Sequence, residues 1–182
     1  MNIDCVKVGK LETNCYILTN NQQTLIIDPG DDFKLIDDKV KGNLIGILVT
    51  HNHDDHICAI KDFLSKYSVK VYDYNNLEER QYKIGNFDFE VIYTGGHTTD
   101  SVTYYFKDNN CLFTGDFLFK DTIGRTDMPT GSFKEMTNSL IKILKYDDNL
   151  KVYPGHGSST TLGYEKRNNY FLINVKQMSS LK

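Results

Sequence analysis

Four runs of strand-forming residues in this sequence each end directly in a histidine or an aspartate. The runs are ILVT before His51, VIYTGG before His97, LFTG before Asp116 and VYPG before His156. In α/β proteins, ligands usually bind in the crevice outside the carboxyl ends of the strands. We therefore expect these four side chains to meet in one crevice of a layered α/β fold.

Short apolar runs, many of them rich in β-branched and aromatic residues, recur along the chain and predict its strands. Strands are expected at residues 16–18, 25–27, 44–49, 69–72, 87–93, 102–106, 111–113 and 151–153. The turn-type residues 107–110 predict a hairpin between two of them. Many strands interspersed with a few helices indicate sheets that are covered by helices.

Helical spacing is present in two segments between the strands. The apolar positions are Ile57, Ile60, Leu64 and Tyr67 in the first segment, and Phe133, Met136, Leu140, Ile143 and Leu144 in the second. The second segment follows a capping box that runs from Ser132 to Glu135. A third, shorter helix is expected to begin near Thr160 or Thr161 and to carry residues 164–167.

The stretch HNHDDH, residues 51–56, holds three of the five histidines of the chain. His51 and His53 are two positions apart, so in an extended chain they point to the same side. Asp54 suits the N-cap of the first helix. Asp55 and His56, on the first turn, would then project in other directions, a geometry that suits two adjacent metal ions better than one. A polar loop also explains such residues, but every histidine lies here or after a strand-like run and glycine.

These residues resemble the metallo-β-lactamase superfamily, whose signature H-x-H-x-D-H is matched by residues 51–56. The later residues His97, Asp116 and His156 follow in the order of that family. The resemblance implies a four-layer αββα sandwich over residues 1–182, which chain length also favours as one domain. It implies a first metal ion on His51, His53 and His97, a second on Asp55, His56 and His156, and Asp116 bridging both.

Further motifs are similar to the small glyoxalase-II-like hydrolases. They are Asn14-Cys15-Tyr16, Ile27-Asp28-Pro29-Gly30, Thr114-Gly115-Asp116-Phe117-Leu118-Phe119, Gly124-Arg125-Thr126-Asp127, Pro154-Gly155-His156-Gly157 and residues 160–166. An aspartate at 116, rather than cysteine or serine, also resembles the hydrolase branch and differs from true β-lactamases. The chain departs from the family at residues 95–101, where Pro-Gly-His-Thr-Pro-Gly-Ser is usual, and at Asn169-Tyr170, where Asn-Pro is common.

Imidazoles and carboxylates suit zinc but also iron and manganese, so we expect two divalent ions, with zinc first among the three. A hydroxide shared by the two ions would attack a carbonyl. A thiolate leaves with little help from an acid, which favours a thioester such as S-lactoylglutathione or another S-acyl conjugate. Asp116 and Asp55 are the expected catalytic residues, and Asp55 either orients the nucleophile or acts only as a ligand.

Other activities stay open at this point. A mononuclear iron persulfide dioxygenase would use His51, His97 and Asp116. Phosphodiester or RNA cleavage is disfavoured because lysines are spread along a chain of net charge −3. Metal binding without catalysis is disfavoured by the full ligand set. Tight glutathione recognition is not expected, because full-length glyoxalase II adds a C-terminal helical region and few residues follow His156.

The remaining features indicate a cytoplasmic protein that acts on a small molecule and binds neither nucleic acid nor a membrane. The N-terminal residues show no signal sequence, and the longest apolar run, 44–49, is too short to span a bilayer. The four cysteines form no C-x-x-C pair, which predicts reduced and mostly buried thiols rather than a metal site or a nucleophile.

Three more residues are candidates for roles at the site. Asp28 either fixes the tautomer of a histidine or forms an Asp-Pro-Gly turn. Arg125 and Asp127 either position the substrate or pair with each other, and their spacing favours the pair.

Overall fold

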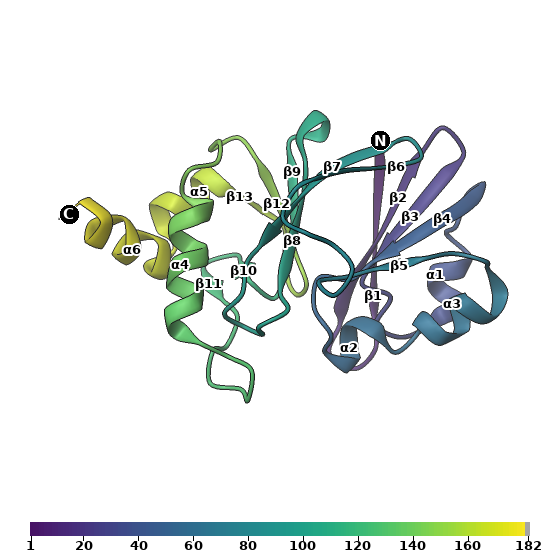
Figure 1. Cartoon of the computed structure of the whole chain (residues 1–182), viewed down its shortest axis with the longest axis horizontal. Coiled ribbons are helices and arrows are strands. Elements are labelled where there is room, and N and C mark those ends of the chain that lie inside the picture. Colours follow the sequence, from purple (N-terminus) through teal and green to yellow (C-terminus); the bar gives the residue numbers. More distant parts are fainter. Residues whose placement is uncertain (181–182) are drawn as a thin grey trace.

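The computed structural model describes residues 1–180, and most of its strands belong to two sheets that lie side by side (Figure 1). The first sheet has the order β1 (Asn2–Val8), β2 (Thr13–Asn20), β3 (Gln23–Ile27), β4 (Asn43–Leu48) and β5 (Val71–Tyr72). The second has the order β13 (Thr160–Thr161), β12 (Lys151–Pro154), β9 (Cys111–Gly115), β8 (Val102–Phe106), β7 (Phe87–Tyr93) and β6 (Gln81–Ile84). A separate ribbon pairs β10 (Leu118–Phe119) with β11 (Thr122–Ile123).

Both sheets mix parallel and antiparallel pairs. In the first sheet β3, β4 and β5 run parallel, whereas β1, β2 and β3 are antiparallel neighbours. In the second sheet β9 and β12 are parallel and the other pairs are antiparallel. The predicted hairpin between β8 and β9 is confirmed, and its turn contains a short 3-10 helix, η1 (Lys107–Asn109).

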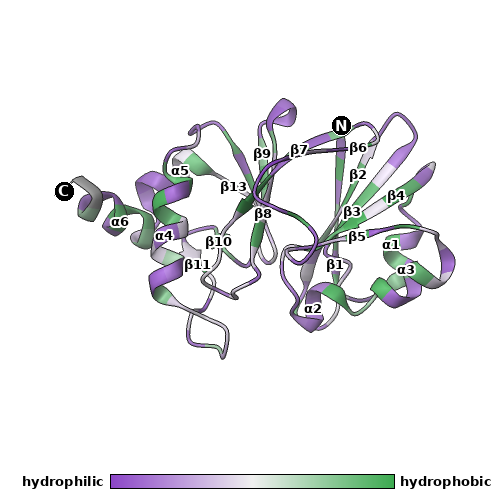
Figure 2. Cartoon of the chain, in the orientation of Figure 1, coloured by the Kyte–Doolittle hydropathy of each residue, from purple (hydrophilic) through white to green (hydrophobic). Residues whose placement is uncertain are grey.

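Helices lie on the outer side of each sheet and produce the αββα order, except for the short α2, which lies at the lower edge of the first sheet in Figure 1. The first sheet carries α1 (Phe33–Asp37), α2 (Asp54–Ile57) and α3 (Ile60–Lys66), and the second carries α4 (Phe133–Ile143), α5 (Leu162–Asn168) and α6 (Tyr170–Ser180). One buried cluster joins Ile36 and Phe63 to the first sheet, and another joins Met136 and Leu140 to the second. In Figure 2, α4 alternates between hydrophobic and hydrophilic residues, as expected of a helix with one buried face.

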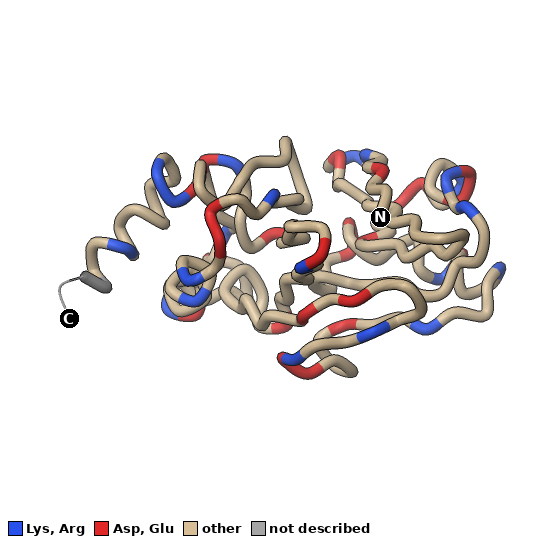
Figure 3. The backbone as a smooth tube through the Cα atoms, turned by 90° about the horizontal axis from the view of Figure 1, so that it is seen from above, with Lys and Arg blue, Asp and Glu red and all other residues tan. Residues whose placement is uncertain are grey.

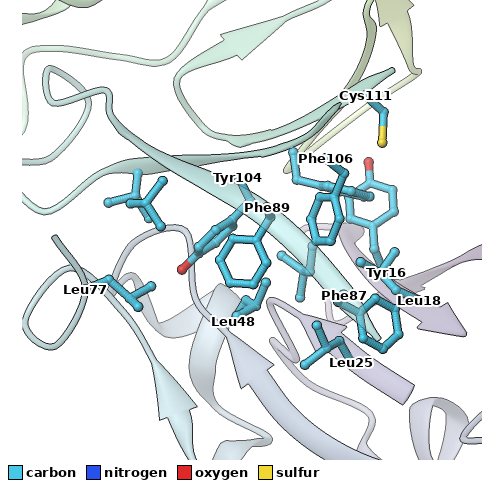
Figure 4. Packing of buried hydrophobic residues seen from close by; sticks show 14 residues of the cluster. Tyr16, Leu18, Leu25, Leu48, Leu77, Phe87, Phe89, Tyr104, Phe106 and Cys111 are labelled. Carbon is cyan, nitrogen blue, oxygen red and sulfur yellow. The ribbon is translucent and has the colours of Figure 1, made fainter. Parts of the chain in front are cut away.

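A third cluster fills the space between the two sheets. Figure 4 shows Phe89, Tyr104 and Phe106 of the second sheet pointing towards Leu48 and Leu25 of the first. The central strands are therefore buried on both faces, by a helix layer outside and by the other sheet inside. This explains why their sequences are continuous apolar runs rather than alternating ones.

Two helices, α4 and α5, begin at a residue whose side chain caps the first turn. Ser132 Oγ accepts a hydrogen bond from the Glu135 N–H at 3.2 Å, and Thr161 caps α5 in the same way. The prediction of Asp54 as an N-cap is wrong. The N-cap position belongs to His53, which has extended backbone, and Asp54 is the first residue of α2. The negative charge of Asp54 still stabilises α2, because it lies near the positive, N-terminal end of the helix dipole.

The helix expected from Ile57 onward is interrupted. The Ala59 N–H donates to Pro29 O at 3.1 Å instead of continuing the helix. Gly30 lies directly against the carbonyl oxygen of Asp55, where an added Cβ would stand 1.7 Å away. In a continuous helix the Ala59 N–H would donate to Asp55 O. The turn at residues 28–30 lies between these two groups and so separates α2 from α3.

Charges and thiols are spread over the molecule. Lys and Arg are scattered among Asp and Glu in Figure 3. Cys15 and Cys111 are buried, but Cys5 and Cys58 are exposed, so the expectation of mostly buried thiols holds for only half of them. No helix in residues 1–180 is long and apolar enough to cross a membrane. The assignment of residues 1–182 to one domain stays a prediction.

Truncation of Phe106 tests the contribution of the layer between the sheets. Its side chain is buried, and its ring lies 5.3 Å from Phe89 and 5.5 Å from Phe113. We expect Phe106→Ala to lower the free energy of unfolding by about 3–5 kcal/mol in denaturant titrations. The exposed Leu35→Ala should change it by less than about 0.5 kcal/mol, and equal losses would contradict this view of the core.

Candidate metal centre

All seven residues predicted as metal ligands come together at one edge of the sandwich. His51 lies three residues beyond β4 in the first sheet, whereas His97, Asp116 and His156 follow β7, β9 and β12 of the second. The seven form three overlapping groups whose ligand atoms lie within 4.8 Å of one another: His51, His53 and His97; His51, His56 and Asp116; Asp55, His56 and His156. The carboxyl ends of the strands therefore converge as the sequence predicted.

The first ligand set consists of three imidazoles. His53 Nδ1 lies 3.0 Å from His51 Nε2 and 3.1 Å from His97 Nε2. Asp116 Oδ2 lies 3.6 Å from His97 Nε2. The donor atoms of three rings and one carboxylate thus face one small volume.

The second ligand set lies beside the first. Asp55 Oδ2 is 3.2 Å from His156 Nε2 and 3.5 Å from His56 Nε2. Asp116 faces this set as well, with Oδ1 3.4 Å from His56 Nε2 and Oδ2 3.6 Å from His156 Nε2. The carboxylate of Asp116 therefore stands between the two sets, where the bridging role requires it.

Main-chain carbonyls fix the tautomers of two histidines. His97 Nδ1 lies 2.8 Å from Arg125 O, and His156 Nδ1 lies 3.1 Å from Leu11 O. A carbonyl oxygen can only accept, so in both rings Nδ1 carries the proton and donates it. The Nε2 lone pair of each ring is then free to bind a metal ion.

Asp28 orients one histidine of each set. Its carboxylate accepts hydrogen bonds from Thr50 N (2.7 Å), Thr50 Oγ1 (2.6 Å) and His56 Nδ1 (3.0 Å). Because Thr50 gives its only hydroxyl proton to Asp28, it accepts from His51 Nδ1, 3.1 Å away. Asp28 is 2% exposed and has a φ of 53°. It therefore has both roles that the sequence offered: it forms the turn, and it fixes the tautomers of His51 and His56.

Two unpaired buried atoms show that these residues fit a metal ion. His56 Nε2 and Asp116 Oδ1 are buried and have no hydrogen-bond partner. Leaving such atoms unpaired costs about 1–3 kcal/mol each. A divalent cation between the rings and carboxylates would accept their lone pairs, and nitrogen and oxygen donors of this kind suit zinc, iron and manganese.

The ionisation states of His51, His53 and Asp55 favour a bound cation, whereas His56 has to release a proton before it can bind one. Burial and the neighbouring histidines lower the pKa of His51 and His53, so both rings are neutral ligands at neutral pH. For His56, burial lowers the pKa, but Asp28 and Asp116 outweigh it and raise the pKa to about 10. Burial raises the pKa of Asp55, but hydrogen bonding to His156 and the charge of His56 outweigh it, and the net shift is downward.

Arg125 and Asp127 form the pair that their spacing favoured. The guanidinium of Arg125 donates to both carboxylate oxygens of Asp127, at 2.9 and 3.0 Å, and both side chains are exposed. The contact of Arg125 with the ligand sets is made by its main-chain oxygen, which accepts from His97.

Several residues that support the ligands were not identified from the sequence. Thr13 Oγ1 donates to Asp55 Oδ2 at 2.9 Å. Asp100, in the loop that departs from the family pattern, accepts from both the N–H and the side chain of Asn52, between the first two histidines. Thr13 could have been found from the sequence, because it adjoins the Asn14-Cys15-Tyr16 motif. The main-chain carbonyls that hold His97 and His156 could not, because they leave no pattern in the sequence.

Comparison with known proteins decides the family. A family model described as the metallo-beta-lactamase superfamily matches residues 8–77 and 69–156. The chain belongs to the metallo-β-lactamase superfamily. It is 29% identical over 208 residues to "hydroxyacylglutathione hydrolase GloC" of Haemophilus influenzae, in an alignment that covers 94% of this chain and 98% of that relative.

Two solved structures extend the comparison. One is described as the BLEG-1 B3 metallo-beta-lactamase and has a TM-score of 0.90, 31% identity, and coverage of 94% of this chain and 99% of that chain. The other is TTHA1623 in a di-iron-bound form, with a TM-score of 0.83, 30% identity, and coverage of 92% and 99%. The predictions of the metallo-β-lactamase family and fold are confirmed.

Replacing Asp28 by asparagine tests its control of His56. An amide NH₂ facing His56 Nδ1 would donate to it, move the ring proton to Nε2 and so block the metal side. We expect Asp28→Asn to weaken metal binding about 10- to 100-fold in competition titrations with a chromophoric chelator. Asp31→Asn, at an exposed neighbour, is the control, and equal affinities in the two variants would contradict the role of Asp28.

Proposed function

We propose that this member of the metallo-β-lactamase superfamily is a dinuclear hydrolase that cleaves an acyl thioester. The position of the Asp116 carboxylate supports this most directly, because its two oxygens face both ligand sets at 3.4–3.6 Å. A mononuclear site would leave the second set, Asp55, His56 and His156, without a use. The proposed cofactors are two divalent ions, with zinc first, and iron or manganese as alternatives.

The residues of the chain have separate tasks in the proposed reaction. When bound, two divalent ions lower the pKa of a shared water and polarise the carbonyl oxygen of the substrate. Asp116 holds the two ligand sets at a fixed separation. Asp55 stays ionised, so it can accept a hydrogen bond from the attacking water and orient it, while Thr13 keeps its carboxylate in place.

The choice of a thioester rests on chemistry and on similarity. A thiolate leaves with little help from an acid, so a thioester needs no dedicated proton donor at the site. The name of the Haemophilus influenzae relative describes hydrolysis of hydroxyacylglutathione. We therefore propose S-lactoylglutathione or a related S-acyl conjugate as the substrate class, a small molecule rather than a nucleic acid.

β-Lactam hydrolysis is a second candidate, favoured by the similarity to the structure described as a B3 metallo-beta-lactamase. An aspartate at 116 argues against a true β-lactamase. The similarity to this structure argues in the other direction, so both substrates are assayed. A mononuclear iron persulfide dioxygenase and a phosphodiesterase are the remaining alternatives. One iron ion per chain with oxygen consumption on a persulfide would support the dioxygenase instead.

Loss of one ligand tests the proposed hydrolase. We expect His53→Ala and Asp116→Ala each to lower thioester turnover at least about a thousandfold, because each removes a ligand needed to activate water. The assay compares acyl thioesters, a β-lactam and a phosphodiester on the same sample. Asp88→Ala, at an exposed ion pair with Lys83, is the control. Parental thioester rates in both ligand variants would overturn the mechanism.

Removal of the metal tests its coupling to stability. An ion that binds only the folded chain adds about 4 kcal/mol when its concentration is about 1,000 times Kd. We expect chelation to lower the midpoint of thermal unfolding by roughly 10 °C and to abolish turnover, and added Zn²⁺, Fe²⁺ or Mn²⁺ to restore both. An unchanged midpoint after complete chelation would show that the residues bind no ion tightly.

A further inference from the structure

Asn14, at the start of β2 in the first sheet, contacts the loop of the second sheet that carries His156. Its side-chain Nδ2 donates to Pro154 O at 3.0 Å and to Gly157 O at 2.9 Å. Its main-chain N–H donates to Gly155 O at 2.7 Å. The three acceptors lie on both sides of His156 in the chain, so Asn14 holds the loop on either side of the ligand.

Tyr16, two residues further along β2, adds a fourth bond to the same loop. Its hydroxyl donates to Pro154 O at 2.6 Å. Asn14 is 2% exposed and Tyr16 is 4% exposed, so water does not compete for these carbonyl oxygens. We call Asn14 and Tyr16 together the β2 clamp.

The loop is held on the side of its own sheet by Gly155, whose N–H donates to Gly115 O at 2.8 Å, but beyond His156 it is open. Gly157 has a φ of +74°, and nothing lies within 4 Å of the place where its Cβ would be. His156 makes a further bond through Nδ1 to Leu11 O, which belongs to the hairpin between β1 and β2. The orientation of His156 therefore depends on the first hairpin of the chain, which lies in the other sheet.

The first ligand set does not depend on this hairpin. His51 is held by Thr50, and His97 by the main-chain oxygen of Arg125. Neither Asn14 nor Tyr16 has a hydrogen bond to these residues in the described part of the chain. Asp28 supports one ring of each set, but the hydrogen bonds of Asn14 and Tyr16 reach only the loop of His156, so the second set can be weakened alone.

We infer that the β2 clamp positions His156 for the second metal ion, and that loss of the clamp leaves a protein that binds only the first ion tightly. The inference rests on the proposed dinuclear centre. It adds the residues whose loss would weaken binding of the second ion without weakening binding of the first. Asn14 and Tyr16 are positioning residues, because they act through the loop and do not touch the ion.

Metal stoichiometry and affinity of the full chain test this inference. Metal-free protein is titrated with Zn²⁺ against a chromophoric chelator, and bound zinc is counted by elemental analysis. We expect the parent to bind two ions, and Asn14→Ala to bind the first with unchanged affinity and the second about 10- to 100-fold more weakly.

Asn20→Ala is the matched control. Asn20 lies on the same strand and also donates a side-chain bond across to the second sheet, to Asn86 O at 2.9 Å, but at the end away from the ligands. We expect it to bind two ions as the parent does. A general weakening of the contact between the sheets would affect both variants, whereas a specific role at His156 affects Asn14→Ala alone.

The other outcomes are decisive as well. Two tightly bound ions in Asn14→Ala, or equal weakening of both, would overturn the role of the clamp while leaving the dinuclear centre in place. Fewer than two ions in the parent would overturn both proposals. If Asn14→Ala does not fold, Tyr16→Phe keeps the ring and removes only the hydroxyl. Selective weakening of the second ion then supports the inference, and unchanged binding of both ions overturns it.

Discussion

The buried carboxylate of Asp28 is the interaction on which the rest of the site depends. It stands at the end of β3, and its own N–H donates to Leu48 O of the neighbouring strand. Its oxygens then reach Thr50 and His56, and through Thr50 also His51. A charge buried in this way is stable only when it is fully hydrogen-bonded, and Asp28 uses that requirement to fix a ring in each ligand set.

The fold around this carboxylate explains why the ligands are supplied by both sheets. Parallel strands β3 and β4 bring the turn at residues 28–30 beside residues 50–56, and that turn also interrupts the helix after α2. Across the interface, β7, β9 and β12 end at the same edge. Neither sheet contains a complete candidate set, because His97 and His156 follow strands of the second sheet whereas the other three histidines and Asp55 follow β4 of the first.

Much of this arrangement was predictable from the sequence, since buried strands and ligands at strand ends leave a strong local pattern. β1 and β6 were missed because they are edge strands whose residues are mostly exposed or half-buried, so no apolar run marks them. The break between α2 and α3 was missed because Pro29 and Gly30, distant in sequence, cause it. The carbonyl partners Leu11 O and Arg125 O were missed because any residue type can supply a main-chain oxygen.

The division of the ligands between the sheets gives metal binding the character of a cross-link. Asp55 and His156 stand far apart in the sequence, and an ion held by both would close a large loop. Closing such a loop costs chain entropy, so the ligands can meet only after β12 has paired with β9 and the two sheets have docked. A chain whose sheets have not docked therefore lacks both candidate sets, and under the proposed metal centre tight metal binding marks the molecules whose long-range pairing is finished.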